Sequence, residues 1–326
     1  MLEQLATLPL AVSFESFTDI DFWTGVGIIA GIYTIFALGL QLNVGFTGIQ
    51  NFGQAAFMAI GAYSMAILVG EGMSFWLSLP ISILITIAFG LLVGLPSLRL
   101  RADYFAIATI ASAEAIRLFA LNARELTGGA QGLFGFGDDW DSVADTIEGW
   151  ISSIGWTDVP TLFPLLLVVW AVAIALMFGL SKAQRTPWGR VLRAVREDED
   201  AARALGKNAF SYKLQSLAIA ATMGAIAGFF LALNLRFVVP DEFLPIVTFS
   251  GYAVLILGGL ASYWGVAFGA VILWFVLEGL RFIDLPLSET RIAALRFIIV
   301  GLILIGLMAF RPQGIFGKRE EMVLGE

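Results

Sequence analysis

Cysteine and histidine are both absent from the 326 residues of this sequence. Disulfide scaffolds, thiol catalysis, zinc sites built from Cys and His, and haem ligation by either residue are therefore excluded. Hydrolytic triads that pair serine with histidine are excluded for the same reason. A membrane enzyme would need a cluster of His, Asp or Cys near the membrane interface, and the sequence offers none. We expect no metal ion, no cofactor and no nucleic-acid partner.

Charge is also scarce: charged residues make up 14% of the chain and hydrophobic residues 59%. A soluble domain has about a quarter of its residues charged. Residues 22–70 and 243–277 contain no Asp, Glu, Lys or Arg at all. As helices these runs would be about 74 and about 52 Å long, whereas the hydrocarbon core of a bilayer is about 30 Å thick. Each run must therefore cross a membrane more than once.

The apolar runs predict an all-α polytopic membrane protein in which residues 1–326 form a single transmembrane domain. Nine runs have spanning length, although the second is short and the seventh contains Pro245, so eight to ten helices are compatible with the sequence. The nine runs lie at residues 23–42, 53–69, 75–98, 104–121, 161–180, 214–235, 244–260, 264–281 and 292–310.

The charges of the loops predict the orientation. Residues 181–213 hold eight basic and four acidic side chains, so the positive-inside rule places this loop in the cytoplasm. Residues 122–161 hold seven acidic side chains and one base, which suits an extracytoplasmic loop. Counting spans from the cytoplasmic loop predicts an N-terminus outside and a C-terminus inside.

The order of the helices suggests an inverted repeat of helices 1–4 and 6–9. Each set has an interrupted apolar segment in the corresponding place, at residues 43–54 and at residues 236–250. Paired broken segments in two oppositely oriented halves are a recurring plan of transporters.

The first interrupted segment, NVGFTGIQNFGQ, combines glycine with uncharged polar side chains at membrane depth. Irregular backbone is tolerated there only where protein buries it or where it lines a water-filled path. It therefore either lines a route for a neutral or zwitterionic solute or forms a tight turn packed against a neighbouring helix. The candidate pathway residues are Asn43, Thr47, Gly48, Gln50, Asn51 and Gln54.

Two pairs of opposite charges occur three residues apart within predicted spans, Glu114 with Arg117 and Glu278 with Arg281. Ionisable groups inside a membrane are costly and are often functional. Each acid, however, has a partner one helical turn away, which favours structural ion pairs. The alternative is a proton relay, and it would be the basis for a secondary carrier driven by protons or sodium.

The cytoplasmic loop contains EDEDAARALG, whose acids, alanines and final glycine predict a short helix. On composition alone this is a solvated loop helix. Its residues are Glu197, Asp198, Glu199, Asp200, Ala201, Ala202, Arg203, Ala204, Leu205 and Gly206.

Six segments, in order, resemble the permease subunits of branched-chain amino-acid importers of the ATP-binding-cassette (ABC) class, in particular the M-type subunit. They cover residues 25–317 and include LGLQLNVGFTGIQNFGQAAFMAIGAY (Leu38 to Tyr63), RLRADYFAIATIASAEAIRL (Arg99 to Leu118), TGGAQGL (Thr127 to Leu133), TPWGRVLRAVREDEDAARALG (Thr186 to Gly206), LGGLASYWGVAFGA (Leu257 to Ala270) and FRPQGIFG (Phe310 to Gly317). Gln54 departs from the pattern, in which we expect a histidine. Permeases for urea and short amides share most of these segments.

The resemblance implies a transport subunit and not an enzyme. Its partners would be a second homologous permease in a heterodimer, two cytoplasmic ATPases and an extracytoplasmic substrate-binding protein, in the inner or plasma membrane of a prokaryote. It also implies that residues 197–206 couple the chain to an ATPase. The sequence has no glycine-lysine phosphate loop of its own, so ATP would be hydrolysed by the partners.

Overall fold

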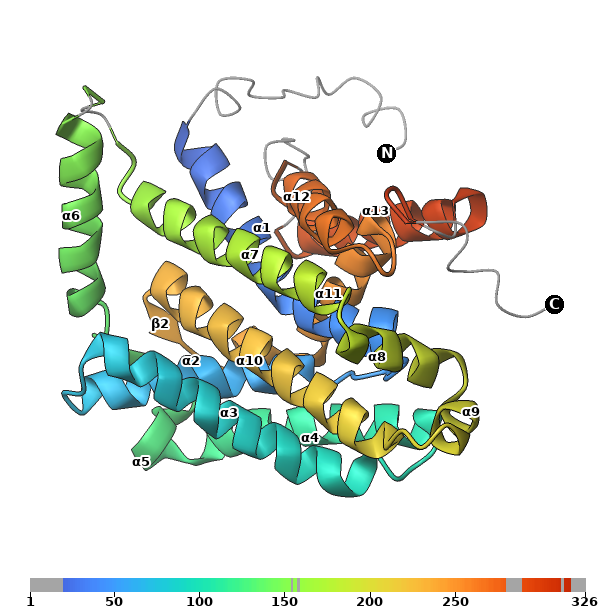
Figure 1. Ribbon diagram of the computed structural model, residues 1–326. Helices are drawn as coiled ribbons and strands as arrows, with labels where there is room; N and C mark the ends of the chain where they lie inside the picture. Colours follow the sequence, from blue (N-terminus) through green and yellow to red (C-terminus); the bar gives the residue numbers. More distant parts are fainter. Residues whose placement is uncertain (1–19, 154, 157–158, 280–288, 312–313, 318–326) are drawn as a thin grey trace, which may run out of the picture.

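The computed structural model describes residues 20–153, 155–156, 159–279, 289–311 and 314–317. It is an elongated bundle whose long helices run between two ends (Figure 1). Helix α6 (Asp138–Ser153) lies at one end, and α8 (Pro187–Glu197) and α9 (Glu199–Ala204) lie at the other. We refer to these as the α6 end and the α9 end.

Each predicted apolar run corresponds to one helix, with bounds that agree within a few residues. The first helix, α1 (Ile20–Leu40), continues as a π-helical turn, η2 (Gln41–Thr47). The others are α2 (Gln54–Gly70), α3 (Phe75–Ser97), α4 (Ala102–Asn122), α7 (Phe163–Ala183), α10 (Ala209–Leu235), α11 (Pro245–Gly258), α12 (Tyr263–Gly279) and α13 (Glu289–Phe310).

Five helices of the described chain are long and apolar enough to cross a membrane, and α11 and α12 together pass the same test although they are bent by 114°. The prediction of an all-α polytopic membrane protein is confirmed. The number of crossings and the orientation remain predictions, since α2 has only 17 residues and the bent pair can be counted in two ways.

Short elements fill the loops between these helices. The loop predicted at residues 122–161 contains α5 (Arg124–Thr127), the 3-10 turn η3 (Gly129–Gln131), β1 (Leu133–Phe134) and α6. Strand β1 pairs antiparallel with β2 (Phe237–Val238), which is followed by the 3-10 turn η4 (Pro240–Phe243). This two-residue ladder, the one departure from a helical fold among the described residues, ties the loop before α6 to the loop after α10.

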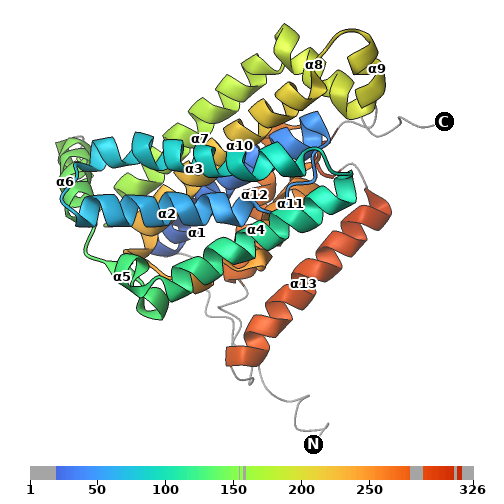
Figure 2. The same ribbon diagram turned by 90° about the horizontal axis from the view of Figure 1, so that it is seen from below.

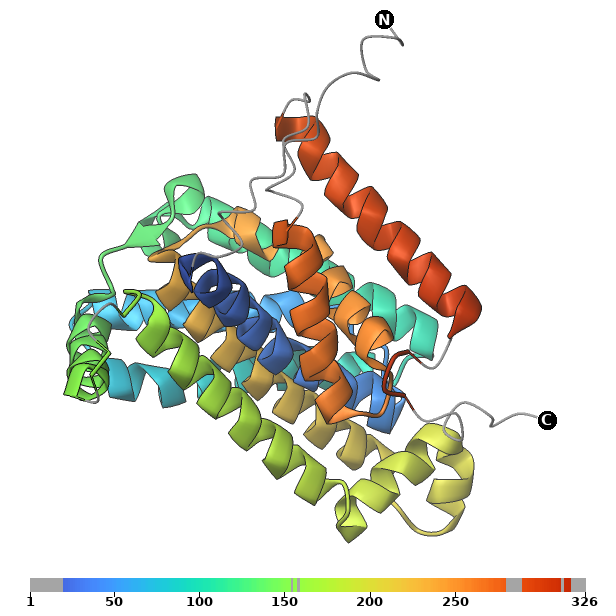
Figure 3. The ribbon, with the colours of Figure 1, turned by 90° about the horizontal axis from the view of Figure 1, so that it is seen from above.

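The helices pack as two similar sets of four. Helix α10 packs against α2 and α3, while α1 packs against α11 and α12. Within the sets α2 packs on α3 and α11 packs on α12, and α4 and α13 flank them (Figures 2 and 3). Ser216, near the start of α10, bonds Asn43, near the end of α1, so the two leading helices run antiparallel. The inverted repeat of helices 1–4 and 6–9 remains a prediction.

The two leading helices form the centre of the bundle. In their most apolar stretches, 83% of the residues of α1 and 78% of those of α10 are buried, against 22% to 33% for α3, α4 and α7. Helices α3, α4 and α7 instead expose large apolar side chains such as Leu92, Ile107 and Phe178. An apolar outer surface of this extent suits contact with lipid.

Glycines allow α10 to approach α2 closely. A Cβ atom added at Gly228 would lie 1.9 Å from the carbonyl oxygen of Met58, and one at Gly61 would lie 2.4 Å from that of Ala225. Both neighbours are helix backbone, which cannot move aside as a side chain can.

We expect Gly228→Ala to prevent accumulation of the folded protein, because the added methyl group forces α2 and α10 apart along their whole contact. The measurement is the monodisperse fraction in size-exclusion chromatography of the detergent extract. Gly179→Ala in α7 is the matched control, since nothing lies within 4 Å of its Cβ position. An interior alanine there is favoured over glycine by up to about 1 kcal/mol. Equal recovery of the two variants would contradict the packing.

Candidate functional site

The first broken segment begins with the π-helical turn and reverses at Gly48. The amide groups of Gly48 and Ile49 both reach the carbonyl oxygen of Asn43, the latter at 2.8 Å. Gly48 has φ 76°, a left-handed conformation that a residue with a Cβ atom adopts at a cost. The chain then runs back into the bundle, and α2 begins at Gln54 beside α1 and α10.

The starts of α2 and α11 meet inside the bundle. The amide of Ala55 donates to the hydroxyl of Thr248 at 3.1 Å. The hydroxyl of Tyr252 donates to the carbonyl of Asn51 at 2.9 Å, and its ring stacks on Phe52 with centroids 4.7 Å apart. The amino ends of two helices, each with a partial positive charge, therefore converge where the two interrupted segments touch.

Four of the six candidate pathway residues are buried: Asn43, Thr47, Asn51 and Gln54 are at most 1% exposed. Thr47 donates to Ser216 at 2.8 Å, and Ser216 donates to the side-chain amide oxygen of Asn43 at 2.9 Å.

The amide of Gln54 links three elements. It donates to the carbonyl of Ala220 at 2.9 Å in α10, lies 3.4 Å from that of Phe36 in α1, and accepts from Asn51 at 3.2 Å. These bonds link the buried polar side chains to one another, and the side-chain nitrogen of Asn43 has no hydrogen-bond partner among the described residues.

The other two candidates, Gly48 and Gln50, are exposed on a cavity of about 300 Å³ at the α9 end. Arg196 of α8, Glu199 of α9 and Lys213 of α10 line the same cavity. The structure thus brings the interrupted segment and the segment expected to dock an ATPase to one place. Whether any of the six residues lines a transport path remains a prediction.

The expected short helix at residues 197–206 is in fact the end of one helix followed by another. Glu197 closes α8, and Asp198 adopts an extended conformation with φ −152°. Its carboxylate accepts from the amides of Asp200 and Ala201, both at 2.9 Å, and so caps α9. Gly206, with φ 77°, follows the end of this helix. The side-chain cap at Asp198 is the reason for the break.

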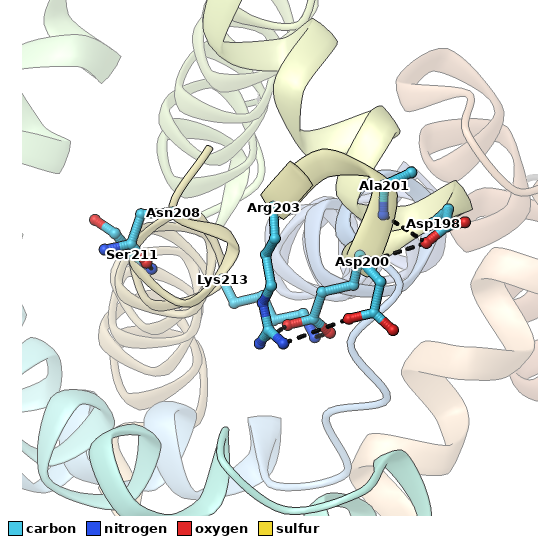
Figure 4. A network of polar contacts seen from close by, with 8 residues as sticks. Asp198, Asp200, Ala201, Arg203, Asn208, Ser211 and Lys213 are labelled. Carbon is cyan, nitrogen blue, oxygen red and sulfur yellow. Dashed lines mark hydrogen bonds and ion pairs between the residues drawn. The ribbon is translucent and has the colours of Figure 1, made fainter. Parts of the chain in front are cut away.

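One ion pair joins α9 to the rest of the bundle, and a second lies within α9 itself (Figure 4). The Glu199 carboxylate accepts from Arg203 at 2.6 Å, and its second oxygen contacts the ammonium group of Lys213 in α10. The side chains of Glu199 and Lys213 are 29% and 19% exposed, so this pair is partly shielded from water. This pair is a direct connection between α9 and α10.

A second link joins α8 to the broken segment. The guanidinium of Arg196 donates to the carbonyl of Gly45, inside the π-helical turn. A Cβ atom at Gly48 would also lie 3.3 Å from the side chain of Arg196. The sequence did not identify five residues that the structure brings to this region, because an isolated hydroxyl or cation in a helix gives no signal of its partner. These residues are Arg196, Lys213, Ser216, Thr248 and Tyr252.

Of the two predicted intramembrane pairs, the structure describes one. Arg117 contacts Glu114 through Nη2 at 2.6 Å and through Nε at 3.0 Å, and its Nη1 lies 3.4 Å from Asp241. Arg281 lies outside the described residues, so the geometry of its pair with Glu278 does as well.

The α6 end carries acidic groups. Arg236, which follows α10, pairs with Asp141 of α6 at 2.5 Å, and this bond holds the pKa of the Asp141 carboxyl below its usual range. In η4, burial raises the pKa of the Glu242 carboxyl, and the nearby Asp241 carboxylate adds to the rise. The folded protein therefore binds a proton at Glu242 more tightly than the unfolded chain does.

We expect Glu242→Gln to raise the thermal midpoint at pH 7 to 8 and to leave it unchanged near pH 4. A raised pKa stabilises the fold fully below the unfolded value, 4.5, and this contribution is lost as the pH rises through the folded value. Glutamine imitates the protonated form and so removes the cost at high pH. The control is Glu125→Gln, because Glu125 is an exposed acid in the loop at residues 122–161. A midpoint that falls at pH 8 would contradict this assignment.

Comparison with known proteins places the chain in a family. The family described as branched-chain amino acid transport system, permease component, matches residues 24–308. The high-affinity branched-chain amino acid transport system permease protein LivM of Salmonella typhimurium is 34% identical over 304 residues, which cover 87% of this chain and 67% of that protein.

LivM of Escherichia coli is likewise 34% identical, over 302 residues and with the same coverage of each chain. No solved structure gives a significant match. With the helical bundle and the apolar outer surface, the match over most of the chain decides the family: this multi-pass membrane protein belongs to the permease components of branched-chain amino acid transport systems.

Proposed function

We propose that the chain is one permease subunit of an ATP-driven importer for branched-chain or other neutral amino acids, in the inner membrane of a prokaryote. The family relation supports the transport role, and its relatives named for branched-chain amino acids support the solute. Its partners are a second homologous permease, two cytoplasmic ATPases and an extracytoplasmic substrate-binding protein. The α9 end faces the cytoplasm in this arrangement.

The observation that carries the mechanism is the bond from Arg196 to the carbonyl of Gly45. An ATPase that grips α9 moves α10 through Lys213 and moves α8 directly. Because Arg196 holds the π-helical turn, movement of α8 reaches the residues around Gly48. Two discrete arrangements of this contact would open and close the α9 end of a path that runs beside α1 and α10.

The converging starts of α2 and α11 suit a solute with a carboxylate. Amino ends of broken helices recur at sites for anionic groups in transporters. Residues 43–54 carry no charged side chain that would hold a zwitterion tightly, so the solute could continue along the path. Glu114 is held by Arg117 in this structure, which favours a structural pair over a proton relay.

Uptake by cells that express the whole transport system, with and without this chain, tests the proposal. We expect labelled leucine to accumulate only when this chain is present, and the chain to co-purify with ATPase subunits and a second permease. Accumulation of labelled urea or acetamide in place of leucine would assign the alternative substrate class. Leucine uptake that persists with inactive ATPases would overturn the ATP-driven mechanism.

A further inference from the structure

A second pocket at the α9 end, of about 530 Å³, lies between the end of α7 and the start of α12 and plays no part in the mechanism above. Three cations line it: Lys182, Arg185 and Arg193. No carboxylate lines this pocket, and no ion pair joins any of the three to an acid within the part of the chain that the structure describes. The pocket therefore presents an uncompensated positive charge.

Buried polar atoms around the same pocket lack partners. Tyr263 is 3% exposed, and its hydroxyl makes no hydrogen bond within the described residues. Arg193 donates through Nη2 to the backbone carbonyl of Gln184 at 3.2 Å, but its Nε and the side-chain oxygen of Gln184 are buried and have no partner in the described part of the chain. A buried polar group without a partner destabilises the fold, so a ligand that pairs with these atoms gains affinity.

The chemistry of these atoms defines the ligand. A guanidinium and a phenol hydroxyl both donate, as phosphate oxygens require, whereas the free oxygen of Gln184 accepts and calls for a hydroxyl group. The group that fits is a phosphate that carries a hydroxylated substituent.

Apolar side chains border the pocket on its outer side. Phe178 of α7 and Trp264 of α12 are 60% and 48% exposed, and their rings meet edge to face with centroids 5.5 Å apart. Exposed aromatic residues at the end of apolar helices are typical of the level of lipid headgroups. A ligand with a phosphate in the pocket would therefore place an apolar tail along α7 and α12.

We propose that this pocket binds the headgroup of an anionic phospholipid, with phosphatidylglycerol as the type that fits. The phosphate accepts from Arg193 and Tyr263 and is attracted by Lys182 and Arg185, while a glycerol hydroxyl donates to Gln184. Basic pockets between transmembrane helices at the cytoplasmic side suit such headgroups. The lipid would brace α7 against α12 at the bend between α11 and α12, independently of the transported solute.

The test uses the full-length chain in detergent and quenching of tryptophan fluorescence by brominated lipids. We expect brominated phosphatidylglycerol to quench at a much lower concentration than brominated phosphatidylcholine, and Trp264→Phe to remove most of this difference. Each exposed cation removed should weaken phosphatidylglycerol binding about fivefold, as expected for ~1 kcal/mol per basic residue. The double variant Lys182→Gln/Arg185→Gln is therefore compared with Arg190→Gln, an exposed arginine of α8 outside the pocket.

Any of four results would overturn the proposal. The first is equal quenching by the two lipids, and the second is an unchanged preference in the double variant. The third is displacement of the lipid by millimolar inorganic phosphate, which would assign the pocket to a free anion. A double variant that loses a co-purifying ATPase while its lipid preference stays intact would assign the basic side chains to protein docking instead.

Discussion

Reversing the charge of Glu199 is expected to lower ATP-driven uptake about tenfold or more while the permease remains folded in the membrane. Glu199→Lys breaks the bonds to Arg203 and Lys213 and places a third cation between them. A coupling loss of ~1.4 kcal/mol already corresponds to a factor of ten. Helix α9 would separate from α10, so that an ATPase bound to it would no longer move the bundle. Uptake and ATP hydrolysis in reconstituted vesicles are the measurements.

Asp200→Lys is the matched control for this prediction. The side chain of Asp200 is 93% exposed and lies 3.6 Å from Arg203, so its reversal changes the charge of α9 without breaking the link to α10. We expect it to lose less uptake than Glu199→Lys, because the bond between Glu199 and Lys213 is kept. Normal uptake and normal assembly of the Glu199→Lys variant would show that residues 197–206 do not couple the ATPase to transport.

Filling the cavity at the α9 end is expected to have an effect of similar size. Gln50 is exposed on this cavity of about 300 Å³, so a larger side chain at this position can fill the cavity. Gly48 is less suitable, because its left-handed backbone would be strained by any substitution and a loss of uptake could then come from misfolding. If the cavity is part of the path, Gln50→Trp lowers leucine uptake about tenfold or more, the factor that ~1.4 kcal/mol produces. The thermal midpoint should stay near that of the wild type.

Two further variants separate a path from a structural network. Gln50→Ala leaves the cavity open and should transport normally. Asn51→Ala removes a buried side chain that bonds Gln54 and the amide of Gly53, and it should lower the thermal midpoint first. Wild-type uptake by a stable Gln50→Trp variant would exclude the cavity from the path.

The sequence is sufficient to predict the helices, because each helix corresponds to one long run of mostly apolar residues. Residues 75–98 and 161–180 are mostly apolar and contain no charged residue, and the helices begin and end within a few residues of the expected positions. A membrane leaves the backbone few alternatives to a helix, which makes this kind of inference dependable. The break at Asp198 was missed because the alanine-rich composition around it also fits one continuous helix.

The candidate site was only partly predictable, since its contacts join residues far apart in the chain. Composition pointed to the polar residues of segment 43–54 but not to Ser216 or Thr248, which complete their hydrogen bonds from α10 and α11. The same composition fits a solvated path and a closed network, and the two differ only in partners supplied by other helices. The basic pocket beside Tyr263 could not be predicted either. Its cations come from residues 181–213, whose positive charge was fully accounted for by the positive-inside rule.

The π-helical turn at residues 41–47 makes the length of this segment as important as its composition. A π-helix bonds residue i to i+5, so it holds one residue more than an α-helical turn would. An in-frame deletion of one codon here would restore α-helical bonding and change, by up to about 100°, the side of the helix on which neighbouring side chains of this turn lie. Asn43 would turn away from Ser216, and Gly48 would leave Arg196, although every remaining amino acid was unchanged. The deletion of one residue from this stretch is therefore expected to disturb more contacts than the substitution of one side chain.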